Sequence, residues 1–350
     1  MEIFASVMSE VKCQELFVQS RNAMGTIFTI YLYANNGTRA GALFEAAFEE
    51  VERLEETLSN YRETSELSRI NRLAARQAVT TDPEVFALLQ ACLVYSQRSN
   101  GAFDVTVGPL MRAWGFFRGK GRYPTDEELH RARQSVGWQH MQLDLATRTV
   151  RFAAPGLELD LGAVGKGYAV DRAVRVLRGA GAKAALVDAG SSTLHAMNAP
   201  PGKNGWSVCV PKPGDRAQTL SRVTLRNQSL STSGSYEKSF QLEGNNYCHV
   251  MDPREGTPVQ GVLQSTLVAR DSTTTDALSN AMFVMGPQAG KKLLATISNS
   301  RGLWILGDLD SQRLVEWQWE DCMDDSKKEM PPARRRKATV EKQREQTPIY

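Results

Sequence analysis

Long apolar runs are missing from this sequence of 350 residues, as are the extremes of composition that mark fibrous chains. No stretch approaches the roughly 18 unbroken apolar residues that a membrane helix needs, and the mean hydropathy is -0.36. Glycine (27) and proline (14) are too few for a collagen-like chain, and charged residues make up 23%. We therefore expect a globular body with a sizeable core and no membrane insertion.

Cysteine is scarce, which narrows the chemistry open to the chain. The five cysteines are odd in number and widely spaced, with no CxxC pair: Cys13, Cys92, Cys209, Cys248 and Cys322. This arrangement argues against a disulfide framework and against a zinc site built from thiolates.

Excess positive charge is confined to one end of the chain. The net charge is +3, yet residues 326–350 hold eight Lys and Arg against three Glu. A nucleic-acid-binding protein usually spreads basic residues over a folded face, so this distribution predicts no nucleic-acid partner. The apolar pattern stops near residue 321. We expect residues 1–320 to form one domain and residues 321–350 a basic, disordered tail.

The first residues lack the pattern of an export signal. No basic region followed by an apolar segment occurs there, and Glu10 and Lys12 precede Cys13, where a lipid-attachment site needs small apolar neighbours. This favours a cytoplasmic protein.

Predicted strands outnumber predicted helices. Alternating or apolar runs predict strands at 16–20, 26–33, 141–145, 149–152, 157–161, 184–187, 206–211, 221–225, 247–251, 264–269, 303–306 and 313–317. Helical patterns occur at 42–58, 83–98, 168–177, 277–285 and 288–296, and Thr125 with Glu128 forms a capping box that opens one more helix. Because the two kinds of element do not alternate, we predict an α+β fold with a mixed, largely antiparallel sheet and flanking helices.

A glycine-rich segment, Gly162-Ala-Val-Gly165-Lys166-Gly167, joins a predicted strand to a predicted helix. Glycine allows close backbone approach, a helix N-terminus favours a phosphate group, and Lys166 adds positive charge. The spacing is too short for a P-loop and reversed relative to GxGxxG. From these residues alone, a phosphate site and a plain turn are about equally good interpretations.

His249 lies in the strand predicted at 247–251, just before the tight turn Asp252-Pro-Arg-Glu-Gly256. A neutral imidazole can accept a proton near pH 7. A half-buried strand histidine bonded to the turn is the commoner explanation of a lone histidine.

Asp276 and Asn280 lie four residues apart near the start of a predicted helix, for which Thr273 or Thr275 is the expected cap. Two oxygen donors on one helical face can hold Mg²⁺ together with substrate phosphates. The alternative is an acidic first turn that complements the helix dipole. An aromatic segment, residues 101–117, suits either a planar ligand ring or core packing.

Eight short blocks follow one another in a fixed order. They are MGT (24–26), SNYRETSELSRIN (59–71), GAFDVTVGPL with WGF (101–116), LDLGAVGKGYAVD (159–171), VDAGSS (187–192), LSTSGSYE (230–237), HVMDPREGTPV (249–259) and TDALSNAMFVMG (275–286). Together they resemble the ApbE family, the FAD:protein FMN transferases, over about residues 19–306. The resemblance implies the family's α+β, T-fold-like domain.

The resemblance also implies a role for individual residues. Asp276, the carbonyl of Gly165 and Asn280 would hold the metal, with Asn280 standing where the family commonly has Thr. His249 would accept the proton of the incoming hydroxyl. Phosphate oxygens would be held by Lys166 and the backbone around Gly167, in a loop braced by Asp160 and Asp171. The FAD would lie near Met24, Tyr61, Phe103, Asp104 and Trp114, with Ser235 also reaching the nucleotide.

The implied activity is Mg²⁺-dependent transfer of FMN from FAD to a Thr or Ser hydroxyl of an acceptor flavoprotein, with release of AMP. Two other functions fit the same residues. One is an FAD pyrophosphatase that gives FMN and AMP. The other is a non-catalytic FAD-binding protein, which the replacement at Asn280 makes plausible.

Overall fold

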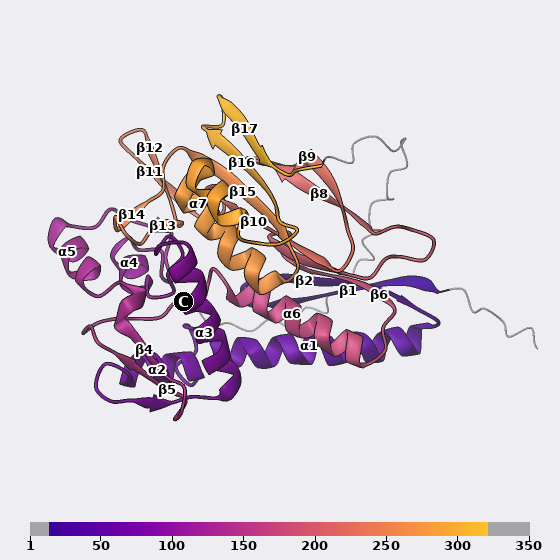
Figure 1. Ribbon diagram of the computed structural model, residues 1–350, viewed down its shortest axis with the longest axis horizontal. Coiled ribbons are helices and arrows are strands. Elements are labelled where there is room, and N and C mark those ends of the chain that lie inside the picture. Colours follow the sequence, from indigo (N-terminus) through magenta and orange to yellow (C-terminus); the bar gives the residue numbers. More distant parts are fainter. Residues whose placement is uncertain (1–13, 321–350) are drawn as a thin grey trace, which may run out of the picture.

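The centre of the computed structural model, which describes residues 14–320, is one large antiparallel sheet (Figure 1). Its eight strands have the order β1-β2-β6-β7-β10-β15-β16-β17. They are β1 (Glu15–Ala23), β2 (Thr26–Ala34), β6 (Ala184–Ala189), β7 (Thr193–Met197), β10 (Gln228–Gly234), β15 (Val262–Ala269), β16 (Arg301–Gly307) and β17 (Gln312–Trp317). All ladders described are antiparallel, and the one parallel contact described is an isolated bridge from Val107 to Glu158. The predicted α+β fold is confirmed.

Three helices cover one face of this sheet: α1 (Gly37–Leu58), α6 (Gly165–Gly179) and α7 (Ser272–Leu294) (Figure 1). The apolar stripe predicted for α1 is its buried face, which includes Leu43, Val51 and Leu54. The other face is covered in part by a ribbon of β8 (Trp206–Lys212) and β9 (Asp215–Leu225). The central strands are thus enclosed between two apolar layers.

A smaller group of elements lies at one end of the helical layer (Figure 1). It contains α2 (Glu66–Leu73), β3 (Val79–Thr80), α3 (Pro83–Arg98), α4 (Gly108–Ala113), α5 (Asp126–Gln134), β4 (Met141–Asp144) and β5 (Thr149–Phe152). The helix predicted at Pro83 and the capping box of Thr125 and Glu128 are confirmed. Nearby stand two small hairpins, β11 (Ser239–Leu242) with β12 (Asn245–Cys248) and β13 (Met251–Asp252) with β14 (Thr257–Pro258).

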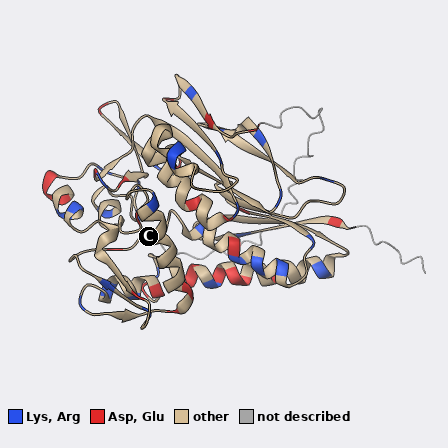
Figure 2. Cartoon of the chain, in the orientation of Figure 1, with Lys and Arg blue, Asp and Glu red and all other residues tan. Residues whose placement is uncertain are grey.

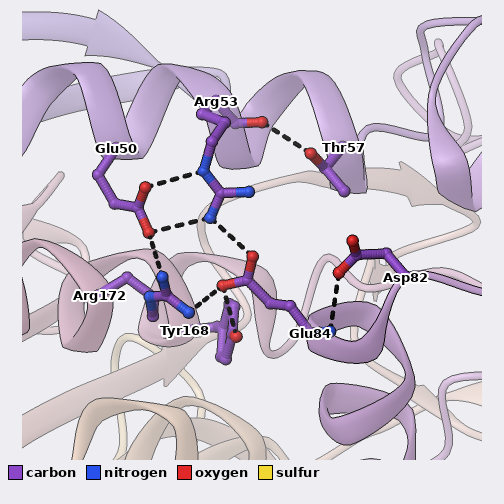
Figure 3. Close-up of polar contacts among 7 residues, drawn as sticks. All are labelled: Glu50, Arg53, Thr57, Asp82, Glu84, Tyr168 and Arg172. Carbon is purple, nitrogen blue, oxygen red and sulfur yellow. Dashed lines mark hydrogen bonds and ion pairs between the residues drawn. The ribbon is translucent and has the colours of Figure 1, made fainter.

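An ionic network joins α1, α3 and α6 (Figure 3). Glu84 of α3 accepts from Arg53 of α1 at 2.7 Å, from Tyr168 of α6 at 2.9 Å and from Arg172 of α6. Glu50 accepts from the same two arginines, and the Arg53 hydrogen bond holds the pKa of its carboxyl below the ordinary value. Figure 2 shows that charged residues concentrate on the helices, whereas the central strands carry few. The network therefore fixes α6, whose first turn contains the last three residues of the glycine-rich segment.

Several element predictions were wrong in detail. Residues 157–161 form no ladder, because Leu159 bonds through its N–H and its carbonyl to the side chain of Asn71 instead. The strand predicted at 247–251 is broken at His249 into β12 and β13. Helix α6 begins at Gly165 rather than near Tyr168.

Helix α7 also differs from its prediction. Its cap is Asp271, which accepts from the N–H of Thr274, rather than Thr273 or Thr275. The two predicted helices are one element interrupted at Gly286, whose φ of 66° is open to glycine at little cost. Within residues 14–320, no helix has the length and apolar character needed to cross a membrane. The predicted tail, residues 321–350, lies outside the described residues.

Candidate functional site

A cavity of about 970 Å³ opens between the small group of elements and the sheet. Its walls come from the β1–β2 turn, the loop before α2, residues 102–120 around α4, the glycine-rich segment, the end of β10, the loop after β12 and the first half of α7. Ten of the predicted site residues line it: Met24, Tyr61, Phe103, Asp104, Asp160, Gly165, Lys166, His249, Asp276 and Asn280. Segments that are far apart in the sequence thus meet at one space.

The carboxylate of Asp276 is buried and held on both oxygens. One oxygen accepts from the backbone N–H of Gly167 at 2.8 Å, and the other accepts from the hydroxyl of Thr193 at 2.9 Å. The residue is 6% exposed and still lines the cavity. An anionic group therefore faces the cavity from a fixed position.

The close approach of α6 and α7 depends on Gly167. A Cβ at this position would lie 2.2 Å from the carbonyl oxygen of Ser272 and 2.6 Å from the Cβ of Asp276. Glycine is thus needed here for packing, and it brings the N-terminus of α6 against Asp276. Lys166, the residue before Gly167, lines the cavity and donates to the carbonyl of Gly162 at 3.3 Å. The helix start and this ammonium together give an electropositive wall suited to phosphate.

The donor set at this wall is made of hard oxygens. Asp276 supplies a carboxylate, Asn280 an amide oxygen and Gly165 a backbone carbonyl, and all three residues line the cavity. Such ligands suit Mg²⁺, which binds through one or two protein oxygens together with substrate phosphates. Among residues 14–320, no group of three or more His, Cys, Asp and Glu side chains forms a cage of its own. The residues present fit a metal shared with a nucleotide.

His249 also lines this cavity, from the break between β12 and β13. Its Nδ1 is 3.2 Å from the carbonyl oxygen of Lys238, which also accepts the His249 backbone N–H at 2.9 Å. Because a carbonyl can only accept, Nδ1 carries the proton and Nε2 keeps a free lone pair. Burial lowers the pKa of His249 to about 4, and the charges of Lys238 and Lys166 act in the same direction. The imidazole is therefore a neutral proton acceptor at pH 7.

One side of the cavity carries stacked planar groups. The rings of Tyr61 and Phe117 stack at 5.1 Å with 8° between their planes, and the guanidinium of Arg112 lies 3.8 Å from the Phe117 ring centre. Arg118 donates to the carbonyl of Tyr61 at 2.8 Å. Tyr61 is 52% exposed, so its ring is accessible to a planar ligand.

Two predicted site carboxylates on the cavity wall serve the loops around it. Asp160 accepts from the N–H of Gly162 at 2.7 Å, and Asp104 accepts from Thr106 and from the N–H of Trp138. Burial raises the pKa of both carboxyls. These contacts fix the loops that border the cavity.

Four predicted residues do not line the cavity. Trp114 is 1% exposed and donates to the carbonyl of Gly256, and Ser235 bonds the carbonyl of Leu263. Gly167 contributes through Asp276, as described above. Asp171 does not brace the glycine-rich loop, because its carboxylate accepts from the N–H groups of Ser272 and Thr273 at the start of α7.

The sequence interpretation missed several contributors. Thr193 and Ser231 approach Asp276 from neighbouring strands, and Asn60 and Asn71 both donate to the carbonyl of Leu159 beside the cavity. A buried hydroxyl in a strand leaves no distinctive sequence pattern, so no signal pointed to Thr193. Ser231, Asn60 and Asn71 do fall within two of the eight blocks.

Comparison with known proteins places the chain in one family. The family model described as "ApbE family" matches residues 24–303. The chain is 34% identical over 272 residues to an FAD:protein FMN transferase of Klebsiella pneumoniae (strain 342), covering 76% of this chain and 82% of the relative. It is 30% identical over 303 residues to the enzyme of the same name from Treponema pallidum (strain Nichols), covering 81% of this chain and 83% of the relative.

Solved structures give the same result. An ApbE protein of Thermotoga maritima superposes with a TM-score of 0.79 at 29% identity, covering 87% of this chain and 97% of the other. The apo form of the Pseudomonas stutzeri flavinyl transferase ApbE gives a TM-score of 0.78 at 27% identity, with 88% and 96% covered. The fold, the ordered blocks and these matches together show that the chain belongs to the ApbE family.

Proposed function

We propose that this chain transfers FMN from FAD to a Thr or Ser hydroxyl of an acceptor flavoprotein and releases AMP. The observation that carries the proposal is one cavity lined both by the oxygen donors around Asp276 and by the neutral imidazole of His249. Family membership gives the reaction class. The residues supply what that class requires, namely charge neutralisation, a base and positioning.

The reaction breaks a phosphoanhydride bond of FAD and forms a phosphoester bond to the acceptor hydroxyl. The acceptor hydroxyl attacks the phosphorus on the FMN side of the pyrophosphate, and its proton passes to Nε2 of His249. The bond from that phosphorus to the bridging oxygen breaks, and AMP leaves with the oxygen. Because Nδ1 donates to the carbonyl of Lys238, the ring is held with Nε2 unprotonated. General-base assistance of this kind contributes roughly 10²–10⁴ in rate.

The remaining residues bind and orient. Lys166 and the start of α6 would hold phosphate oxygens, and Asp276, Asn280 and Gly165 would hold a Mg²⁺ ion. Such an ion neutralises charge on the pyrophosphate, which favours attack by an alcohol. The exposed ring of Tyr61 would stack on the planar part of the FAD.

Two substitutions test the proposal by mass spectrometry of an acceptor domain incubated with the full chain, FAD and Mg²⁺. His249→Ala should keep FAD binding and lose roughly 10²–10⁴ in the rate at which the acceptor gains FMN. Asp276→Ala should abolish turnover that depends on Mg²⁺. A His249→Ala chain with undiminished transfer would remove the base assignment, and an Asp276→Ala chain that stays active and sensitive to EDTA would place the metal elsewhere.

The same experiment separates the alternative functions. AMP release that is equal with and without acceptor, with no FMN on the acceptor, would identify an FAD pyrophosphatase. FAD binding without AMP release at any Mg²⁺ concentration would identify a non-catalytic binding protein. The cytoplasmic location and the boundary of the domain at residue 320 stay predictions from the sequence.

A further inference from the structure

Hydroxyl groups surround the Asp276 carboxylate on the side of the sheet. Thr193 on β7 donates to one carboxylate oxygen at 2.9 Å, and Ser231 on β10 lies 3.4 Å from the same oxygen. The two hydroxyls are 2.8 Å apart, and Thr193 is fully buried. Two strands that are distant from Asp276 in the sequence, β7 and β10, therefore contact its carboxylate from the side of the sheet.

The number of hydrogens available shows which of the two hydroxyls, that of Thr193 or that of Ser231, donates to Asp276. A hydroxyl has one hydrogen to donate, and a carboxylate can only accept. With its hydrogen on Asp276, Thr193 must accept from Ser231 in the contact between them. The hydrogen of Ser231 also has the carbonyl of Ser192 within 3.1 Å, so Ser231 has other partners and Thr193 is the main side-chain donor to Asp276.

The two main donors to Asp276 bond to different oxygens of its carboxylate. The N–H of Gly167 from α6 holds one, and Thr193 from the sheet holds the other. Two such bonds set the rotation of the carboxylate plane, which decides where its remaining lone pairs point. Without Thr193, a buried oxygen would lack its main donor and the group could turn toward other partners.

We propose that Thr193 is a positioning residue that fixes the Asp276 carboxylate for metal binding. This inference rests on the proposed function, since it takes Asp276 as a metal ligand. Thr193 lies in a strand behind the carboxylate, is fully buried and does not line the cavity. Its hydroxyl contacts Asp276 and Ser231, so any effect on a bound metal passes through the carboxylate.

The test is a titration of Mn²⁺ into the full chain without nucleotide, followed by the EPR signal of free Mn²⁺. Thr193→Val keeps the shape and removes the hydroxyl, and we expect Mn²⁺ to bind about 10–100-fold more weakly. Thr193→Ser restores a hydroxyl and should bind Mn²⁺ nearly as the natural chain does. Thr193→Cys, with a poor donor of similar size, should resemble Thr193→Val.

The matched control is Thr266→Val, the same change at another fully buried strand position. Its hydroxyl pairs with Thr232 at 3.0 Å and has no described contact with Asp276. Mn²⁺ affinity should be unchanged there.

An Asp276→Ala chain distinguishes the assignment of Asp276 as a metal ligand from the positioning role of Thr193. If it binds Mn²⁺ as tightly as the natural chain, the metal assignment itself is wrong. If Asp276→Ala loses Mn²⁺ while Thr193→Val and Thr193→Cys keep full affinity, the positioning role is overturned and the metal site stands. Equal weakening in Thr193→Ser and Thr193→Val would also overturn it, because the hydroxyl would then not be the cause.

Discussion

The backbone conformation of Met24 depends on a contact that its neighbours in the sequence do not indicate. It has a φ of 50°, and Gly25 follows with a φ of 72°, the pair of positive values that a tight hairpin turn needs. Gly25 makes the turn predictable. The strain at Met24 is not predictable, because the bond from its N–H to Glu55 at 2.9 Å comes from a helix 31 residues away in the chain.

The lowered pKa of His249 gives a prediction for a second single residue. Its pKa of about 4 lies below the ordinary value, so the basic form survives as the pH falls through 6.5 and is lost only near pH 4. The acid limb of kcat/KM for FAD, which reports the free enzyme, should therefore lie well below pH 6. Bound FAD brings negative charge near the ring, so the limb of kcat should lie at higher pH.

Rates of FMN transfer measured from pH 4 to pH 8 check this expectation. The His249→Ala chain serves as the control, because its slower rate should show no such limb. A kcat/KM limb near pH 6.5 in the natural chain would mean that the ring is solvated and titrates normally.

At the scale of elements, the packing of helix α6 against α7 depends on one glycine, Gly167. Gly167→Ala would place a methyl group 2.2 Å from the carbonyl oxygen of Ser272, so α6 and α7 must move apart. We expect a loss of about 1–3 kcal/mol in the free energy of unfolding, as for overpacked cores, and weaker Mn²⁺ binding. Urea unfolding and the Mn²⁺ titration measure the two effects.

Gly179→Ala is the matched control in the same helix, since a methyl group there meets nothing within 4 Å. Alanine favours helix by up to about 1 kcal/mol over glycine, so this variant should be at least as stable as the natural chain. Equal behaviour of the two variants would show that the α6–α7 contact at Gly167 is not tight.

The element scale also shows where prediction from sequence ends. Helix α3 and the capping box of α5 follow from local signals, Pro83 after Asp82 and Glu128 after Thr125, and were predicted correctly. Residues 157–161 have a strand-like pattern, yet their hydrogen bonds go to Asn60, Asn71 and Val105. Such partners lie far away in the chain, and a local pattern cannot indicate them.

At the scale of the whole molecule, the ionic network of Figure 3 couples the small group of elements to the helical layer. Glu84→Gln removes the charge that two arginines and Tyr168 contact. The arginines are partly exposed to water, which screens the pairs, so we expect a loss of roughly 1–2 kcal/mol in the free energy of unfolding.

Urea unfolding at pH 7 measures the loss. The control is Glu127→Gln, whose partner Arg131 is 3.8 Å away on an open surface and whose loss should be within about 0.5 kcal/mol. If Glu84→Gln matched that control, the network would contribute nothing to the coupling of α3 with α1 and α6.

The composition of the cavity wall has a consequence for the chain as a whole. Its lining runs from Met24 to Asn280, and neither half of that span contributes a complete wall. No proteolytic fragment that lacks either end of this span should retain flavin affinity, and during synthesis the cavity cannot assemble until α7 has emerged. Binding of FAD is therefore a reporter of complete folding, and ligand should protect distant loops from protease together rather than one by one.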